Sequence, residues 1–97
     1  MPLADDLTKA EIKTDAAGRV LAVGLDGGWV YLEISDDDGA TPKPWPDGAL
    51  RKPICAADEE PPTIAVFHDG TLIVCATQSG LVRTFLSRDD GEHWEGL

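Results

Sequence analysis

The chain has 97 residues and a mass of 10.4 kDa, which is enough for one domain. Eighteen acidic against eight basic residues give a formal net charge of −10. This charge argues against nucleic acid and anionic membranes as partners, because both are bound mainly through lysine and arginine. Apolar residues make up 42% of the chain, too many for a disordered acidic tail. We therefore expect a small acidic globular domain whose core is marginal unless a partner adds to it.

The N-terminus carries acids where a signal peptide needs a basic region and an apolar run. No window is long and apolar enough for a membrane span. We expect cytoplasmic synthesis, with incorporation into a virion or other particle left open. Cys55 and Cys75 are predicted to be free thiols, although the sequence leaves their pairing open. With His68 and His93 as the only histidines, we predict no metal site and no cofactor.

The first half of the chain predicts a short helical turn followed by two strands. Residues 3–12 are the one weak candidate for that turn. Residues 20–24 and 29–34 alternate as strands do, and they flank the turn at 26–28. Alternation in the second strand predicts two faces, one with Trp29, Tyr31 and Glu33 and the other with Val30, Leu32 and Ile34.

Residues 42–62 contain six of the seven prolines and predict an extended connector. Strands resume at residues 63–67, 71–77 and 81–86, separated by the turns at 68–70 and 78–80. Ten glycines punctuate the chain, and no stretch keeps a helical apolar stripe for three turns. This pattern is typical of an all-β domain.

The two halves of the chain are the same unit twice. A shift of 52 residues without gaps places Gly18 on Gly70 and Gly28 on Gly80, with apolar strand positions between them. We divide the single domain 1–97 into a first repeat at about 8–42, the connector 42–62, and a second repeat at about 63–97. A period of about 50 residues built from short strands is typical of propeller blades.

Each repeat closes on a motif of serine, aspartate and glycine. The second copy, residues 87–94, reads S-x-D-x-G-x-x-W, and the first, residues 35–41, reads S-x-D-x-G-x-T with Pro42 where the aromatic would stand. The motif resembles the Asp-box, or BNR, repeat of sialidases, sortilin-type receptors and some phage structural proteins. The resemblance implies two antiparallel propeller-like blades, with each box joining the third and fourth strands. The matching positions are Ser35, Asp37, Gly39, Thr41, Ser87, Asp89, Gly91 and Trp94.

The chemistry of the motif suggests a structural role. An aspartate in a tight turn accepts hydrogen bonds from nearby backbone N–H groups, and a serine hydroxyl can do the same. Gly39 and Gly91 can take the positive φ that such a turn demands, and Trp94 can pack on the blade. We expect the boxes to stabilise the fold. The acids at 36–38 are read as a solvated turn, since their spacing differs from a calcium loop.

The resemblance to sialidases raises an enzymatic alternative. Those enzymes use several arginines, a tyrosine nucleophile with a supporting glutamate, and an aspartate. This chain has one tyrosine, Tyr31, and four arginines, and it lacks the Arg-Ile-Pro segment that ordinarily accompanies the boxes. It also has no G-x-S-x-G elbow. We therefore predict that the protein is not an enzyme, with glycoside hydrolysis as the less favoured alternative.

Aromatic residues remain as possible contacts for a ligand or partner: Trp29, Tyr31 and Trp45. For Trp29 the alternative is packing within a blade. Trp45 lies in the polyproline-type segment 42–46, where it either clamps the connector onto a blade or protrudes to stack on a sugar or a partner.

Two repeats are too few for a ring, which needs about four to eight blades. Three arrangements are open: a cyclic homo-oligomer such as a trimer, a subunit docked on a larger assembly, or a sandwich-like monomer. Residues 7–13 could also supply a strand to a neighbouring protomer. We expect a non-enzymatic structural or recognition module, such as a small subunit of a phage tail or capsid appendage. A lectin-like, carbohydrate-binding ring is the alternative.

Overall fold

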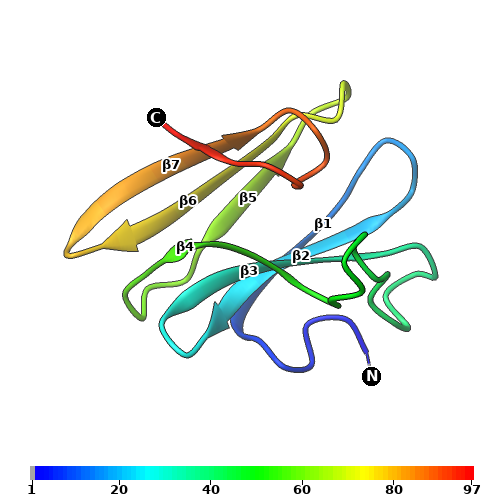
Figure 1. The fold of residues 1–97 in the computed structure, drawn as a ribbon, viewed down its shortest axis with the longest axis horizontal. Helices are drawn as coiled ribbons and strands as arrows, with labels where there is room; N and C mark the ends of the chain where they lie inside the picture. The colour runs from blue at the N-terminus through cyan, green and yellow to red at the C-terminus, as the bar shows by residue number, and fades with distance from the viewer. Residues whose placement is uncertain (1) are drawn as a thin grey trace.

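The computed structural model describes residues 2–97, which form two four-stranded antiparallel sheets (Figure 1). The strands of the first sheet follow the chain order β1 (Thr8–Thr14), β2 (Val20–Asp26), β3 (Trp29–Ser35) and β4 (Lys52–Ala56). The second sheet continues with β5 (Thr63–Val66), β6 (Leu72–Gln78), β7 (Leu81–Ser87) and β8 (Glu95–Gly96). The predicted all-β class is confirmed. Within residues 2–97 no helix is long and apolar enough to cross a membrane.

The repeat seen in the sequence is present in the strands. A shift of 52 residues carries β2 onto β6 and β3 onto β7 with coincident ends. Each pair forms a hairpin whose two-residue turn has positive φ at both positions, Gly27 and Gly28 in the first sheet and Ser79 and Gly80 in the second. Such turns match the twist of the strands they join.

The two faces of each sheet carry different residues, and we call them face A and face B. In the first sheet face A consists of buried side chains of β2 and β3, namely Leu21, Val23, Leu25, Val30, Leu32 and Ile34. Face B of that sheet carries the alternate residues, including Trp29, Tyr31 and Glu33, as the alternation predicts. The 52-residue shift defines the same two faces in the second sheet.

The sheets stack with face A of the first against face B of the second. The shared core contains the face A residues above together with face B residues of β5 and β6, namely Ile64, Leu72, Val74 and Ala76. Face A of the second sheet points away from this core. Both sheets therefore face the same way along the stack.

Trp45 fills the core beside the two sheets. Its side chain is 8% exposed and belongs to the inter-sheet cluster. Its backbone closes a turn, since Trp45 N donates to Ala49 O at 2.8 Å and Gly48 N donates to Trp45 O at 2.7 Å. The segment at 42–46 is thus clamped onto the first sheet, as one of the two readings of its sequence anticipates.

The proline-rich segment 42–62 contains a strand that the sequence reading did not separate from the connector. β4 pairs with β3 and completes the first sheet, with a register shift between Val30 and Tyr31. Pro53 lies within β4. Proline is tolerated there because β4 is an edge strand, where one side of the backbone needs no partner.

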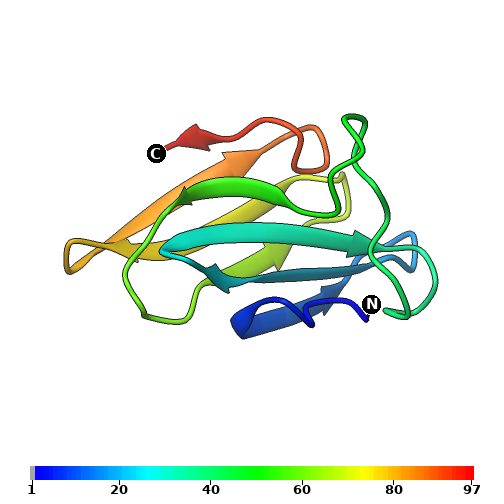
Figure 2. The same cartoon turned by 60° about the horizontal axis from the view of Figure 1, so that its bottom comes forward.

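The expectation of a helical turn at residues 3–12 is wrong. Residues 3–6 form turns, and β1 begins at Thr8. The segment 2–7 lies on the side of the first sheet away from the second sheet (Figures 1 and 2). It approaches closely, because a Cβ added to Gly24 would lie 2.9 Å from Leu7 Cβ and 3.1 Å from Thr8 O. The glycine on face B makes this contact possible.

Strand β1 also contacts both sheets. It pairs with β2 of its own chain and so forms one edge of the first sheet. Across the gap between sheets, Glu11 Oε1 accepts a hydrogen bond from Ile64 N at 3.0 Å. Lys9 Nζ donates to Glu59 O in the loop before β5. These two contacts fix the edge of one sheet against the edge of the other.

Candidate functional site

The second box forms a hydrogen-bonded turn between β7 and β8. Ser87 Oγ donates to Asp89 Oδ1 and accepts from Gly91 N, each at 2.8 Å. Asp89 Oδ1 also accepts from His93 N at 2.9 Å, while Asp89 Oδ2 lies 2.6 Å from His93 Nδ1. Asp90 and Gly91 have φ of 59° and 89°, which explains why a glycine follows the acids.

The first box has the same geometry. Ser35 Oγ donates to Asp37 Oδ1 at 2.5 Å and accepts from Gly39 N at 2.9 Å. Thr41 takes the place of His93, since its N donates to Asp37 Oδ1 at 2.9 Å and its Oγ1 donates to Asp37 Oδ2 at 2.5 Å. The eight box residues therefore gather into two matching turns, each directly after the third strand of its sheet.

The two boxes differ at the missing aromatic. In the second, Trp94 Nε1 donates to Gly91 O at 2.9 Å, and the ring packs against the inter-sheet core. In the first, Gly39 O accepts from the backbone N of Leu3 at 3.0 Å. The buried side chain of Leu3 lies beside Gly39. The N-terminal segment thus donates to the first box the hydrogen bond that Trp94 donates to the second, and Leu3 provides the apolar contact.

Hydrogen bonds lower the pKa of both box aspartates to about 2. For Asp37 the largest cause is the hydrogen bond from Ser35, followed by those from Thr41. For Asp89 it is the backbone hydrogen bond from His93, followed by that residue's side chain. Each carboxylate is needed in its ionised, accepting form, which agrees with a role in holding the turn.

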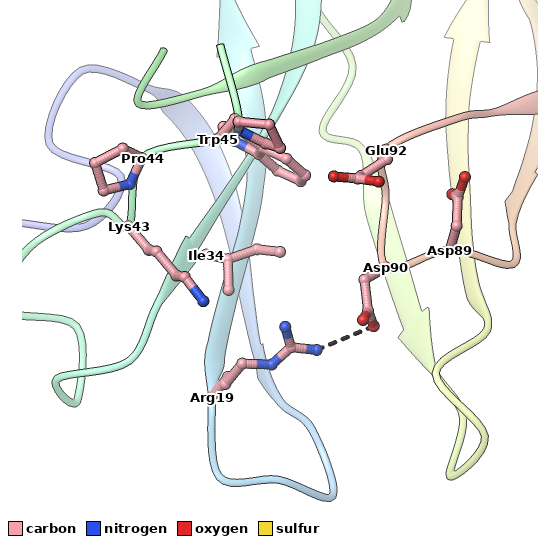
Figure 3. A pocket seen from close by; sticks show the side chains of 9 residues that line it. Arg19, Ile34, Lys43, Pro44, Trp45, Asp89, Asp90 and Glu92 are labelled. Carbon is pink, nitrogen blue, oxygen red and sulfur yellow. Dashed lines mark hydrogen bonds and ion pairs between the residues drawn. The ribbon is translucent and has the colours of Figure 1, made fainter. Parts of the chain in front are cut away.

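A cavity of about 400 Å³ opens between the sheets on the side of the second box. Figure 3 shows Lys43 and the ring of Trp45 on one wall and Glu92 on the other. Arg19 crosses its floor, where Nη2 lies 3.0 Å from Asp90 Oδ1 and Nε lies 2.7 Å from Asp15 Oδ2. The cavity combines an aromatic edge with charges of both signs, so it could hold a small polar molecule such as a sugar.

A buried carboxyl on face B of the first sheet is the feature that sequence reasoning missed. Glu33 has no exposed surface, and its Oε1 accepts from Ala4 N at 2.9 Å while Oε2 has no hydrogen-bond partner. Burial, then the neighbouring Asp6 carboxyl group, raises the pKa of Glu33 to about 7, whereas the pKa of Asp6 is lowered, chiefly by its interaction with Glu33. The alternation in residues 29–34 places Glu33 on face B of the first sheet. It does not show that Glu33 is buried, because the residues that cover it, 2–7, are distant in the sequence.

Arg51 balances the charge around this group. Its Nη1 lies 3.3 Å from Asp6 Oδ2 and 2.8 Å from Asp26 Oδ2, and its guanidinium carbon is 3.9 Å from the centre of the Tyr31 ring. Tyr31 is therefore stacked against a cation on face B of the first sheet.

The three aromatic contact candidates do not converge. Trp29 and Tyr31 lie on face B of the first sheet, where Trp29 is 46% exposed, while Trp45 is buried in the inter-sheet core. Cys55 is buried and its pKa is raised, chiefly by that burial; Cys75 is half-buried, and both thiols are free. Among residues 2–97 no group of three or more histidine, cysteine, aspartate or glutamate side chains is placed to hold a metal ion.

Comparisons with protein families, curated proteins and solved structures find no match to this chain.

The box aspartates predict how acid destabilises the fold. Their folded pKa of about 2 lies below the unfolded value of about 3.9. The stability they contribute is present above about pH 4 and is lost as the pH falls towards 2. We expect the double variant Asp37→Asn, Asp89→Asn to show a shallower fall of unfolding free energy across this range, measured by urea titration. The exposed Asp5→Asn should keep the wild-type slope, and an equal slope in the double variant would contradict the assignment.

Glu33 predicts the opposite trend nearer neutrality. Its folded pKa of about 7 lies above the ordinary value of about 4.3, so its contribution is full below that value and is lost as the pH rises through 7. We expect Glu33→Gln to exceed the wild type in unfolding free energy by roughly 2–4 kcal/mol at pH 8, where the wild type carries the buried charge. The difference should shrink as the pH falls towards 4. Glu60→Gln, at an exposed position, serves as the control; parallel curves for all three proteins would refute this reading.

Proposed function

We propose that the chain is a non-enzymatic structural and recognition module made of two Asp-box blades. Its proposed place is as a small subunit of a multi-protein particle, such as a phage tail or capsid appendage. The observation that carries this proposal is the stacking of two repeated sheets, face A on face B. A closed ring has about four to eight such sheets, so two sheets form only a part of one. A stack of this kind acts by presenting faces and rims to partners.

The burial and hydrogen bonding of the carboxyl groups support the proposal that the protein is not an enzyme. Glycosidases place two carboxyls on either side of a substrate cleft. Here the carboxyl with the most raised pKa, Glu33, is sealed under residues 2–7 and has no exposed surface. Asp37 and Asp89 are occupied by hydrogen bonds that hold the box turns.

Assembly with itself or with a larger structure is part of the proposal. A ring of three such chains would bring face A of one second sheet onto face B of the next first sheet. That closure requires residues 2–7 to leave the position where Leu3 and Ala4 bind Gly39 and Glu33. Association that leaves this segment in place needs no such rearrangement.

The subunit proposal is tested on the chain in its native source. We expect it to sediment with a particle far heavier than 10.4 kDa in a lysate separated on a density gradient, followed by mass spectrometry of each fraction. The same fractions from a source lacking the chain's coding sequence should show the particle altered or incomplete. Recovery only at the mass of free chains would contradict the proposal.

A lectin-like function is the second candidate, and the cavity beside Trp45 is the observation that favours it. Aromatic edges and charged groups at a cavity wall are suited to sugars. A lectin should give signals on a glycan array that are lost in Lys43→Ala, Glu92→Ala and kept in the exposed-site variant Asp5→Asn. Trp45 itself is a poor probe because its removal would disturb the core. Absence of any glycan signal at all concentrations would remove this candidate.

A further inference from the structure

Face A of the second sheet has an apolar centre and a charged rim, since Glu95 pairs with Leu86 on this face and Asp69 lies beside Phe67 and Ile73. It carries Ile73, Cys75, Thr77, Val82, Thr84 and Leu86, and the neighbouring strand β5 adds Phe67 at its end. Val82 is 72% exposed and Phe67 is 48% exposed. Charged residues make up 27% of the chain, yet on this face they are confined to the rim. A sheet face that stays in water normally alternates towards polar and charged residues.

The equivalent face of the first sheet shows what such a face does in this molecule. The 52-residue shift relates Leu21 to Ile73, Val30 to Val82 and Ile34 to Leu86. In the first sheet these positions are almost fully buried by the second sheet. The second sheet keeps its apolar character at the same three positions, and no further sheet within residues 2–97 packs on them. Val82 is therefore 72% exposed, whereas Leu86 at the other end of the face is buried at 9% exposure.

The other end of the stack is already covered. Residues 2–7 lie on face B of the first sheet, held by the bonds from Ala4 N to Glu33 and from Leu3 N to Gly39. Gly24 is adapted to the contact, since any side chain there would meet Leu7. The molecule is a stack with one capped end and one open end, whereas stacked repeats usually need a cap at each end.

We propose that a second copy of this chain covers the open end, with face A of the second sheet meeting its own counterpart across a two-fold axis. This proposal rests on the proposed function, in which the sheets are stacked blades. It adds which face two copies of the chain use to contact each other. A two-fold contact uses the same patch on both copies, so it leaves both N-terminal caps in place. The product is a stack of four sheets that is capped at both ends. Head-to-tail contact would instead compete with residues 2–7 for face B of the first sheet.

The size of the face sets the strength expected. The four strands contain 4, 7, 7 and 2 residues, and a spacing of about 4.8 Å between strands and about 3.3 Å per residue gives a footprint of about 300 Å². Stable complexes bury about 800 Å² on each partner, so we expect a weak dimer that forms in the micromolar to millimolar range. Each copy carries a charge of −10, and salt should therefore strengthen the dimer by screening the repulsion.

Sedimentation equilibrium of the purified chain tests this contact. The apparent mass should rise from 10.4 kDa towards twice that value with concentration, and it should rise earlier at high salt. Val82→Lys, at a position exposed enough to leave the fold intact, should stay monomeric. Leu81→Lys is the matched control: Leu81 is the adjacent residue, is 62% exposed and lies on face B, so this variant should dimerise as the wild type does.

Modification of Cys75 by a maleimide gives a second readout, because this half-buried thiol lies in the middle of the face. Its reaction should slow at dimer-forming concentrations in the wild type and in Leu81→Lys, but not in Val82→Lys. A wild-type chain that is monomeric up to about 1 mM overturns the proposal, as does a mass above the dimer or a dimer that survives Val82→Lys. These outcomes leave the native-particle test unaffected, so the two proposals can fail separately.

Discussion

The contact of the second box with the first sheet is the constraint on which the two-sheet arrangement depends. A Cβ at Gly91 would lie 2.5 Å from Leu32 Cδ2 and 3.3 Å from the Trp45 ring. The same glycine has φ of 89° and donates its N–H to Ser87. One residue thus shapes the turn and sets the distance between the sheets, because a side chain at this point would force them apart. The box motif therefore acts in tertiary packing as well as in local turn formation.

The first box obtains comparable support from a remote part of the chain. Gly39 O is bound by Leu3 N, where the second box uses the indole of its own Trp94. The first repeat, which has Pro42 at the position of Trp94, is therefore coupled to the N-terminal segment. That segment also covers the carboxyl group of Glu33. The burial raises the pKa of this group. The box, the cap and the buried acid form one coupled unit on the outer side of the first sheet.

Local patterns in the sequence predict much of this fold. The 52-residue shift anticipates β2, β3, β6 and β7 with their turns, because hairpins depend on nearby glycines and on alternation. β4 escapes prediction because Pro53 and its neighbours hide a strand that only the edge of a sheet tolerates. The environment of Glu33 also escapes, since Ala4, Asp6 and Arg51 reach it from distant positions. Box residues that bond within seven positions are visible in the sequence, whereas contacts made by folding back are not.

The hydrogen bond from Ile64 to Glu11 has a consequence for what happens when molecules collide. β5 is an edge strand, and a free N–H on such a strand is a place where the backbone of another molecule can add. Glu11 occupies that donor with a carboxylate, which accepts the bond but offers no continuing strand. Lys9 and Lys13 place further charges along β1, the neighbouring edge. The carboxylate of Glu11 thereby hinders the addition of another strand at this point of the β5 edge.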